Sequence, residues 1–198
     1  MRGQRDDDRA KDGRGMSSEL VADRAAVDAA AEFASLADRH LDSAYRLAAV
    51  ILGDPTEAED AAHDAVVAAW RAFGSLRDHG RFEPWLCRIV TNVCRDRMRS
   101  RLRRPVAELP GDDDPGVPAV SDAAIRVASR DAIGRAFERL DPDERIVVAL
   151  RYYRDLPVEE IGARLGIPGG TVKSRLNRAL GRMRAEMTRR GWRETADE

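Results

Sequence analysis

The segment 156–184 constrains the fold more than any other part of the chain, because two short helical patterns meet in it at a Gly and Pro corner. An α-helix advances about 100° per residue, so residues three, four and seven apart share one face. The first pattern spans 158–165 and gathers its apolar residues on one side, namely Val158, Ile161 and Leu165. The Gly-Ile-Pro sequence at 166–168 then ends the helix in a tight turn. The second helix therefore has to cross the first rather than continue it.

The second helical pattern has two unlike faces. With Val172 as the reference, the apolar residues fall in one sector roughly 100° wide, as expected of a stripe that faces a core; they are Leu176, Ala179, Leu180, Met183 and Met187. The other half of the helix carries Lys173, Ser174, Asn177, Arg178 and Gly181. A long cation, a hydroxyl and an amide suit phosphates and base edges in a major groove. The segment predicts a helix-turn-helix that contacts DNA; a merely solvated charged face is the alternative.

The composition favours helices over sheets. Charged residues make up 35% of the chain and aromatic residues 5%, so a core has to come mainly from Ala, Leu, Val and Ile, as in small helical bundles. A length of 198 residues allows one ordinary domain or two small ones. We expect an all-α protein of two small helical bundles, the C-terminal one containing the helix-turn-helix.

The net charge of -1 conceals a sharp segregation of charge along the chain. Segment 95–104 carries six Arg against one Asp, and 173–193 carries eight basic residues against one Glu. Between them, 105–125 holds five acidic residues and no basic one. Two basic surfaces separated by an acidic segment indicate two contacts with nucleic acid and a linker that does not compete as a third.

Composition also sets the predicted boundaries. Residues 1–18 have few apolar groups and many Arg, Asp and Gly, so we expect a disordered N-terminal tail. A first bundle is expected over 19–103. Residues 104–121 are rich in Pro, Gly and Asp, which predicts a flexible acidic linker. The second bundle is expected over 122–190, with a short tail at 191–198.

Three helices are predicted in the first bundle. An apolar pattern of period 3.6 predicts one over 27–52. A second is predicted over 54–73, because its first residues, Asp-Pro-Thr-Glu, supply an N-cap acid, a Pro at the first helical position and a Glu at the third. The segment 74–81 holds two Gly and no periodicity, which predicts a loop before a third helix over 84–102. In the second bundle, Asp-Pro-Asp-Glu at 141–144 repeats the same start signal.

Several classes of protein are disfavoured by what the sequence lacks. No stretch approaches the roughly 18 apolar residues that span a bilayer and the N-terminus has no apolar signal core, so we expect a cytoplasmic protein without membrane insertion. Cys87 and Cys94 would lie about 10 Å apart along one helix, too far for a disulfide, so they should pack as small apolar residues. No HExxH, Walker or Gly-rich dinucleotide motif occurs, so we expect neither an enzyme nor a bound metal or cofactor.

Three blocks of sequence carry a family resemblance. They are AEDAAHDAVVAAW at 58–70, WLCRIVTN at 85–92 and GTVKSRL at 170–176. In this order they resemble the extracytoplasmic-function (ECF) group of sigma factors of bacterial RNA polymerase, which are built from regions 2 and 4 only. The resemblance covers residues 33–187, and three blocks in the family's order are far more specific than one. The chain departs from the family's commoner residues at His63, Pro157 and 78–80.

The resemblance implies three sets of contacts. The helix-turn-helix would bind the -35 element of promoter duplex through Thr171, Lys173, Ser174, Arg175, Asn177 and Arg178. The first bundle would capture the melted -10 element through Leu76, Arg77, Asp78, His79, Gly80, Arg81, Asn92, Arg95 and Arg99. The second helix would dock on the clamp formed by the largest subunits of core RNA polymerase, through Glu59, Asp60, His63, Asp64, Val67 and Trp70. An anti-sigma protein is a further partner that the resemblance implies.

Several of these residues have a purely structural alternative. Core packing is an equal alternative for Trp70 and the favoured role for Phe82 and Trp85, because large aromatic side chains usually pack inside their own domain. The arginines over 97–104 would hold the DNA backbone without sequence preference.

Energetics favour a protein that works with a larger partner. Separating about ten base pairs costs on the order of 14 kcal/mol, at roughly 1.4 kcal/mol per step, whereas each captured base returns about 1 to 3 kcal/mol. The chain alone would not hold a DNA bubble open. The competing interpretation is a free-standing helix-turn-helix regulator that binds duplex DNA without polymerase. That interpretation explains the C-terminal half equally well, but not the base-capture loop or the Arg cluster of the first half.

Overall fold

The computed structural model describes residues 6–103 and 132–189, with side chains from residue 24 onward apart from residue 25. Within these ranges the regular structure is helical and contains no strand, which confirms the all-α prediction. The predicted linker at 104–121, the first residues of the second bundle and the tail at 191–198 lie outside the described residues.

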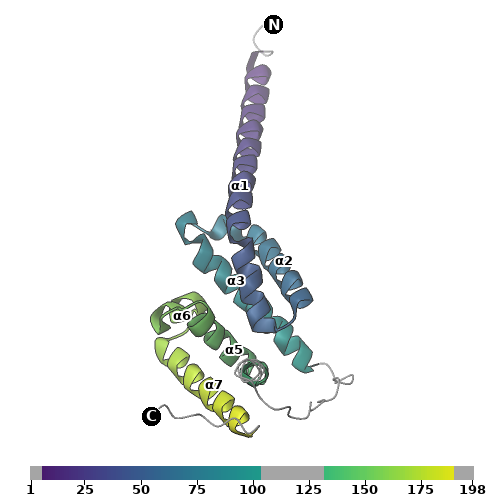
Figure 1. The fold of residues 1–198 in the computed structure, drawn as a ribbon. Coiled ribbons are helices and arrows are strands. Elements are labelled where there is room, and N and C mark those ends of the chain that lie inside the picture. The colour runs from purple at the N-terminus through teal and green to yellow at the C-terminus, as the bar shows by residue number, and fades with distance from the viewer. Residues whose placement is uncertain (1–5, 104–131, 190–198) are drawn as a thin grey trace.

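The first bundle consists of three long helices in contact with one another (Figure 1). They are α1 (Asp6–Leu52), α2 (Pro55–Ala72) and α3 (Phe82–Arg103). Two short 3-10 turns, η1 (Phe73–Ser75) and η2 (His79–Arg81), connect α2 to α3. The N-terminal half of α1 extends beyond the rest of the molecule.

The boundary between α1 and α2 forms as the sequence predicts. Gly53 adopts a φ of 76° and its N–H donates to the carbonyl oxygen of Ala49 at 2.9 Å, which ends α1. The Asp54 carboxylate accepts a hydrogen bond from the backbone N–H of Glu57 at 2.9 Å, and Pro55 occupies the first turn. The predicted N-cap of α2 is therefore confirmed.

Three predicted boundaries differ from the structure. The helix expected from residue 27 extends back to Asp6, through residues expected to be a disordered tail. Its first residues are acidic, and negative charge at a helix N-terminus is favourable. The second helix ends at Ala72, one residue early, where η1 begins. The third begins at Phe82 rather than 84, because the Asp78 carboxylate accepts the N–H of Gly80 at 3.0 Å and starts a turn that continues into α3.

Aromatic rings fill the end of the first bundle nearest to the α2–α3 connection. Phe82 is 1% exposed and its ring centroid lies 5.9 Å from that of Phe33 and 6.3 Å from that of Phe73. Trp85 is half-buried against the same cluster, 5.7 Å from Phe82. The predicted core role of Phe82 and Trp85 is confirmed.

The second bundle is built from shorter elements. Residues 132–138 are helical, and the chain continues through α5 (Pro142–Val148), the π-helical turn η3 (Ala149–Tyr153), α6 (Val158–Leu165) and α7 (Gly169–Arg189). Both α5 and α6 pack on α7. The first described core residues of this bundle are apolar and buried, among them Ala132, Ala136, Leu140, Ile146 and Leu150.

The start of α5 is only partly as predicted. Pro142 occupies the first turn and Asp143 and Glu144 follow it, but the side chain of Asp141 makes no capping hydrogen bond. The Asp141 carboxylate accepts instead from Arg182 of α7, at 2.8 Å. A charged partner on a neighbouring helix therefore replaces the backbone N–H as its contact, which local sequence does not indicate.

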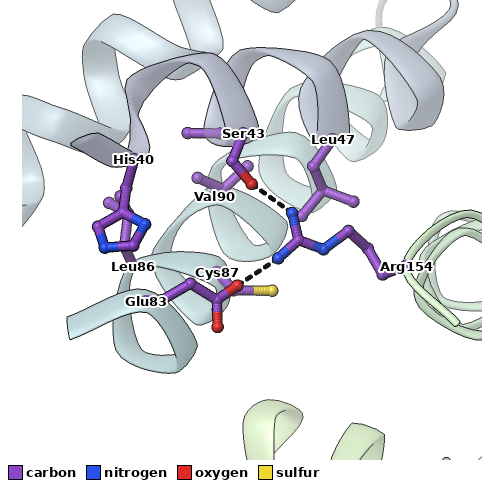
Figure 2. Close-up of a pocket in the computed structure, with 9 residues that line it drawn as sticks. His40, Ser43, Leu47, Glu83, Leu86, Cys87, Val90 and Arg154 are labelled. Carbon is purple, nitrogen blue, oxygen red and sulfur yellow. Dashed lines mark hydrogen bonds and ion pairs between the residues drawn. The ribbon is translucent and has the colours of Figure 1, made fainter. Parts of the chain in front are cut away.

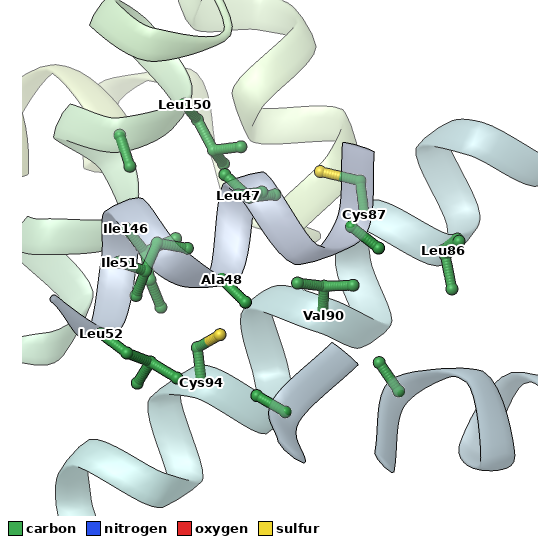
Figure 3. Packing of buried hydrophobic residues seen from close by; sticks show 14 of the residues in the cluster. Leu47, Ala48, Ile51, Leu52, Leu86, Cys87, Val90, Cys94, Ile146 and Leu150 are labelled. Atoms are coloured by element: carbon green, nitrogen blue, oxygen red, sulfur yellow. The ribbon is translucent and has the colours of Figure 1, made fainter. Parts of the chain in front are cut away.

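The two bundles pack against each other and share one buried apolar cluster. Figure 3 shows Leu150 beside Leu47, and Ile146 beside Ile51, where the second bundle meets α1. All four side chains are at most 2% exposed. The sequence predicts two bundles joined by a flexible linker but does not predict how they sit; in the structure the two bundles are in contact. The buried apolar side chains of the two bundles therefore form one continuous core.

Arg145 adds a polar contact to this apolar interface. It is 8% exposed and donates to the carbonyl oxygen of Ile51 in the last turn of α1, at 3.1 Å. A cation is favourable at a helix C-terminus. Burial lowers the pKa of Arg145, and its Nε has no hydrogen-bond partner among the described residues. Arg145 of the second bundle therefore binds the C-terminal end of α1 in the first bundle.

Candidate nucleic-acid interface

The corner between α6 and α7 depends on two glycines. Gly166 follows α6 with a φ of 67°, a left-handed conformation that favours glycine. The Ile167 N–H then donates to the carbonyl oxygen of Gly162 at 3.0 Å. A Cβ on Gly162 would lie 2.8 Å from the carbonyl oxygen of Ile167. Gly162 therefore lets the turn fold back onto α6, and α7 crosses it as predicted.

Replacing Gly162 by alanine should destabilise the second bundle. The helix gains about 1 kcal/mol from alanine, but the added carbon meets backbone that cannot move without opening the corner, at a cost of about 1 to 3 kcal/mol or more. We expect a lower urea midpoint by circular dichroism. Gly181→Ala is the matched control, because no described atom lies within 4 Å of a Cβ placed there. A loss of stability in the control, or none at Gly162, would contradict this account of the corner.

Helix α7 separates its two faces as the sequence predicts. Val172, Leu176 and Ala179 are buried, and the rest of the predicted apolar stripe is half-buried, namely Leu180, Met183 and Met187. The predicted polar face is exposed at Lys173, Ser174, Asn177, Arg178 and Gly181. Arg178 bonds only locally among the described contacts, with its Nε 3.4 Å from the carbonyl oxygen of Ser174. A basic and polar helix face is therefore open to solvent.

Two of the residues predicted for the -35 element are less open. Thr171 is half-buried at the first turn of α7. The Arg175 side chain is 20% exposed, and its guanidinium lies 3.4 Å from the carboxylate of Asp143 in α5. Arg175 is thus paired with a carboxylate of its own bundle in this arrangement.

The loop predicted to capture a base is exposed and anchored. Arg77, Asp78, Gly80 and Arg81 are exposed, and Leu76 is half-buried against the core. His79 is held from both sides, by stacking on the ring of Phe73 at 4.8 Å and by a 2.5 Å contact of its Nδ1 with the Glu32 carboxylate. The backbone of the loop is thus fixed while most of its side chains reach solvent.

The remaining residues predicted for the -10 element lie on α3, and their side chains bind other side chains of the protein. Asn92 is exposed, and its side-chain oxygen accepts from Arg95 at 2.7 Å. Arg95 and Arg99 both donate to the carboxylate of Asp143, at 2.7 and 3.1 Å. The structure brings Asn92 and Arg95 together, but it turns both arginines toward the second bundle.

The face of α2 predicted to meet polymerase is open. Glu59, Asp60, His63 and Asp64 are exposed and Val67 is half-buried. Two of these carboxylates bind one arginine of α3, since Arg97 lies 2.5 Å from Asp64 and 3.9 Å from Asp60. Trp70 is 46% exposed, with its ring centroid 5.1 Å from that of Phe33. Trp70 therefore has one face on the core and one face available.

Sequence reasoning missed a cluster of charges between the bundles. Figure 2 shows Arg154 of the second bundle reaching Ser43 of α1 and Glu83 of α3. The Glu83 carboxylate also accepts from Arg164 of α6, at 2.7 and 2.9 Å. Burial alone would lower the pKa of Arg164, but its hydrogen bonds with Glu160 and the charge of Glu83 outweigh burial and raise it. Nothing local in the sequence marks Glu83 as this hub.

Both cysteines are buried and free, as predicted. Burial raises the pKa of Cys94 to about 12 and also raises that of Cys87, where Arg164 partly offsets the effect. A thiol is reactive as the thiolate, so both side chains are unreactive in this arrangement.

Comparison with known proteins identifies the family. Residues 36–104 match the family model of Sigma-70 region 2, and 136–185 match that of Sigma-70 region 4. Over 84% of its length the chain is 36% identical to the ECF RNA polymerase sigma factor SigM of Mycobacterium tuberculosis, of which it covers 82%. The chain belongs to the ECF sigma factors. This ECF factor is an alternative sigma factor of RNA polymerase, and a free-standing regulator is not favoured, because region 2 is present as well as region 4.

Two solved structures resemble this ECF factor. CnrH, solved with the cytosolic domain of CnrY, is 27% identical with a TM-score of 0.54, over 79% of this chain and 87% of that one. The sigma factor RpoE of Bartonella quintana, solved with the anti-sigma factor NepR, shares the fold, with 23% identity and a TM-score of 0.52 over 75% of this chain and 91% of that one. Among the residues that the structure describes, no helix has the length and apolar character needed to cross a membrane.

Proposed function

We propose that this ECF factor directs core RNA polymerase to its promoters by reading the -35 duplex with α7 and capturing the melted -10 element with the 76–81 loop and α3. We assign residues 19–103 to the region 2 domain and 122–190 to the region 4 domain. The observation that carries the proposal is the exposed basic face of α7 in a chain that also presents an anchored, open loop. The protein would act in the cytoplasm, with the polymerase performing the chemistry.

The -35 contact is proposed for the polar side of α7. Thr171, Lys173, Ser174, Arg175, Asn177 and Arg178 supply cations for phosphate and donors and acceptors for base edges. Four of the six are exposed in the described structure, and the helix is presented by a corner that fixes its direction. This is the usual placement of a recognition helix.

The -10 contact is proposed for the loop and the adjoining face of α3. Leu76, Arg77, Asp78, His79, Gly80 and Arg81 would surround a base that has left the stack, and Asn92, Arg95 and Arg99 would hold its strand. A pocket that receives a flipped base needs a fixed backbone and free side chains. The anchoring of His79 by Phe73 and Glu32 supports this assignment.

The polymerase contact is proposed for α2. The exposed carboxylates of Glu59, Asp60 and Asp64 surround a helix face that ends in the half-open ring of Trp70, with His63 and Val67 between them. Trp is enriched among the residues that contribute most of the binding energy in protein interfaces. We propose that this face docks on the clamp of the core enzyme, and that an anti-sigma protein is a second partner of the chain.

A change in the loop should alter which -10 sequence is used. Exchanging Asp78, His79 and Gly80 for Gly-Asp-Ser leaves α7 untouched, so binding to -35 duplex should stay the same while the preference among -10 sequences shifts by about 10-fold. Run-off transcription over a panel of -10 sequences measures the shift, and gel mobility with -35 duplex is the control. Unaltered preference with full activity would refute the loop assignment.

Run-off transcription with purified core polymerase tests the function as a whole. The chain should confer initiation at defined promoters and none without the core enzyme. A chain that never confers initiation but binds promoter duplex tightly by itself would act as a free-standing regulator instead.

A further inference from the structure

One carboxylate gathers arginines from both proposed DNA surfaces. Asp143, in the first turn of α5, binds Arg95 at 2.7 Å and Arg99 at 3.1 Å, both from α3, and its Oδ2 lies 3.4 Å from Arg175 of α7. We call these four residues the Asp143 cluster. The side chains of Asp143 and Arg95 are 25% and 19% exposed, so the pairing is partly shielded from solvent. The contacts of Asp143 with Arg95 and Arg99 join the two bundles, whereas its contact with Arg175 lies within the second bundle.

The Asp143 carboxylate offers these arginines the same kind of anionic oxygen as a DNA phosphate. A carboxylate and a phosphate both offer two or more anionic oxygens to a guanidinium, and arginine binds either one in a fork geometry. Arg95 and Arg99 are proposed to hold the -10 strand and Arg175 the -35 duplex. With Asp143 between them, the same donors are directed at the protein itself.

Contacts around the cluster keep the bundles together. Arg154 of the second bundle binds Glu83 of α3 (Figure 2). Arg164 binds the same carboxylate. The apolar side chains of Leu150 and Ile146 also meet α1 (Figure 3). The second bundle therefore lies over the face of α3 that carries Arg95 and Arg99, and it has to move away before DNA reaches both arginines.

We propose that Asp143 stands in for a DNA phosphate and holds the free protein closed, so that closure and promoter binding compete for the same arginines. The inference rests on the proposed function, because it needs these arginines to bind DNA. No sequence motif indicates this role of Asp143, which competes with promoter phosphates for the arginines.

The reactivity of the Cys87 thiol measures whether the two bundles are in contact, and the measurement needs neither DNA nor polymerase. Cys87 lies on α3 beside Glu83 and interacts with Arg164, and it is 5% exposed. Opening removes Arg154 and Arg164 from this site, so its thiol should become reactive. Cys94 on the same helix is fully buried and reports unfolding instead. Labelling with iodoacetamide followed by peptide mass spectrometry measures both.

The test compares Asp143→Asn with Asp155→Asn in the full chain. Asp155 is the matched control, since its side chain is 96% exposed and pairs only with Arg151 of the same bundle among the described contacts. We expect Asp143→Asn to raise the labelling rate of Cys87 by about fivefold and the affinity of the free protein for forked promoter DNA by a similar factor. The control should match the wild type in both.

The other outcomes decide against the proposal. Unchanged labelling of Cys87 would show that Asp143 does not hold the bundles closed, and faster labelling without tighter DNA binding would show that closure does not compete with DNA. If Cys94 is labelled as well in Asp143→Asn, the variant is unfolded. The labelling of the wild type in about 1 M NaCl then tests the proposal, because salt weakens the ion pairs of the cluster. Cys87 should then label faster and Cys94 should not; no effect of salt overturns the proposal. Failure of run-off transcription with normal labelling would overturn the proposed function alone.

Discussion

Replacing Lys173 and Arg178 together by alanine is expected to abolish measurable binding of this ECF factor to -35 duplex DNA. Both side chains are exposed on the face of α7 that lies opposite the buried Val172 and Leu176. Each contact to a base edge or phosphate contributes about 1 to 3 kcal/mol, so losing the pair should lower the affinity by roughly 30-fold to more than about 10,000-fold. Fluorescence anisotropy with labelled duplex at fixed salt measures the loss.

The control for this pair removes the same charge from elsewhere. Arg135→Ala with Arg139→Ala takes two arginines from outside α7, in the same bundle, where Arg139 is 54% exposed and lies 3.3 Å from Glu186. A general loss of electrostatic attraction would weaken both double variants alike. If the control binds as weakly as the α7 variant, or the α7 variant binds as well as the wild type, α7 is not the reading helix.

Replacing Phe82 by alanine is expected to cost the largest share of stability of any single truncation considered. The ring is 1% exposed and packs among Phe33, Phe73 and Trp85, and truncation of such a side chain costs about 3 to 5 kcal/mol. Domains of this size are stable by only about 5 to 15 kcal/mol. We expect a much lower urea midpoint and loss of -10 recognition, because Phe82 follows η2 directly.

Two controls separate packing from general effects. Phe82→Leu keeps most of the volume and should cost about 1 to 1.5 kcal/mol. Tyr153→Ala removes an aromatic ring that is 45% exposed, and should change stability by about 0.5 kcal/mol or less. A stable Phe82→Ala variant with normal -10 recognition would show that the aromatic cluster does not support the loop.

The helix-turn-helix could be predicted because its signals are local. The rotation of residues along α7, the left-handed Gly166 and the N-cap at Asp54 each involve neighbours within a few turns of chain. Helix ends were predicted less well, since Asp78 starts a turn that joins α3, and α1 begins at Asp6 rather than at residue 27.

The sequence by itself determined an all-α chain, the apolar faces of its helices and the exposed basic face of α7. Only the tertiary structure decided that the bundles meet, and which carboxylates hold them. Asp143 lies 48 residues from Arg95, and Glu83 lies 71 residues from Arg154 and 81 from Arg164. Periodicity reports on residues within a few helical turns, whereas ion pairs across such separations depend on how whole helices are placed. The carboxylates of Asp143 and Glu83, which the sequence alone would place in solvent, are therefore paired with arginines of the other bundle in the folded chain.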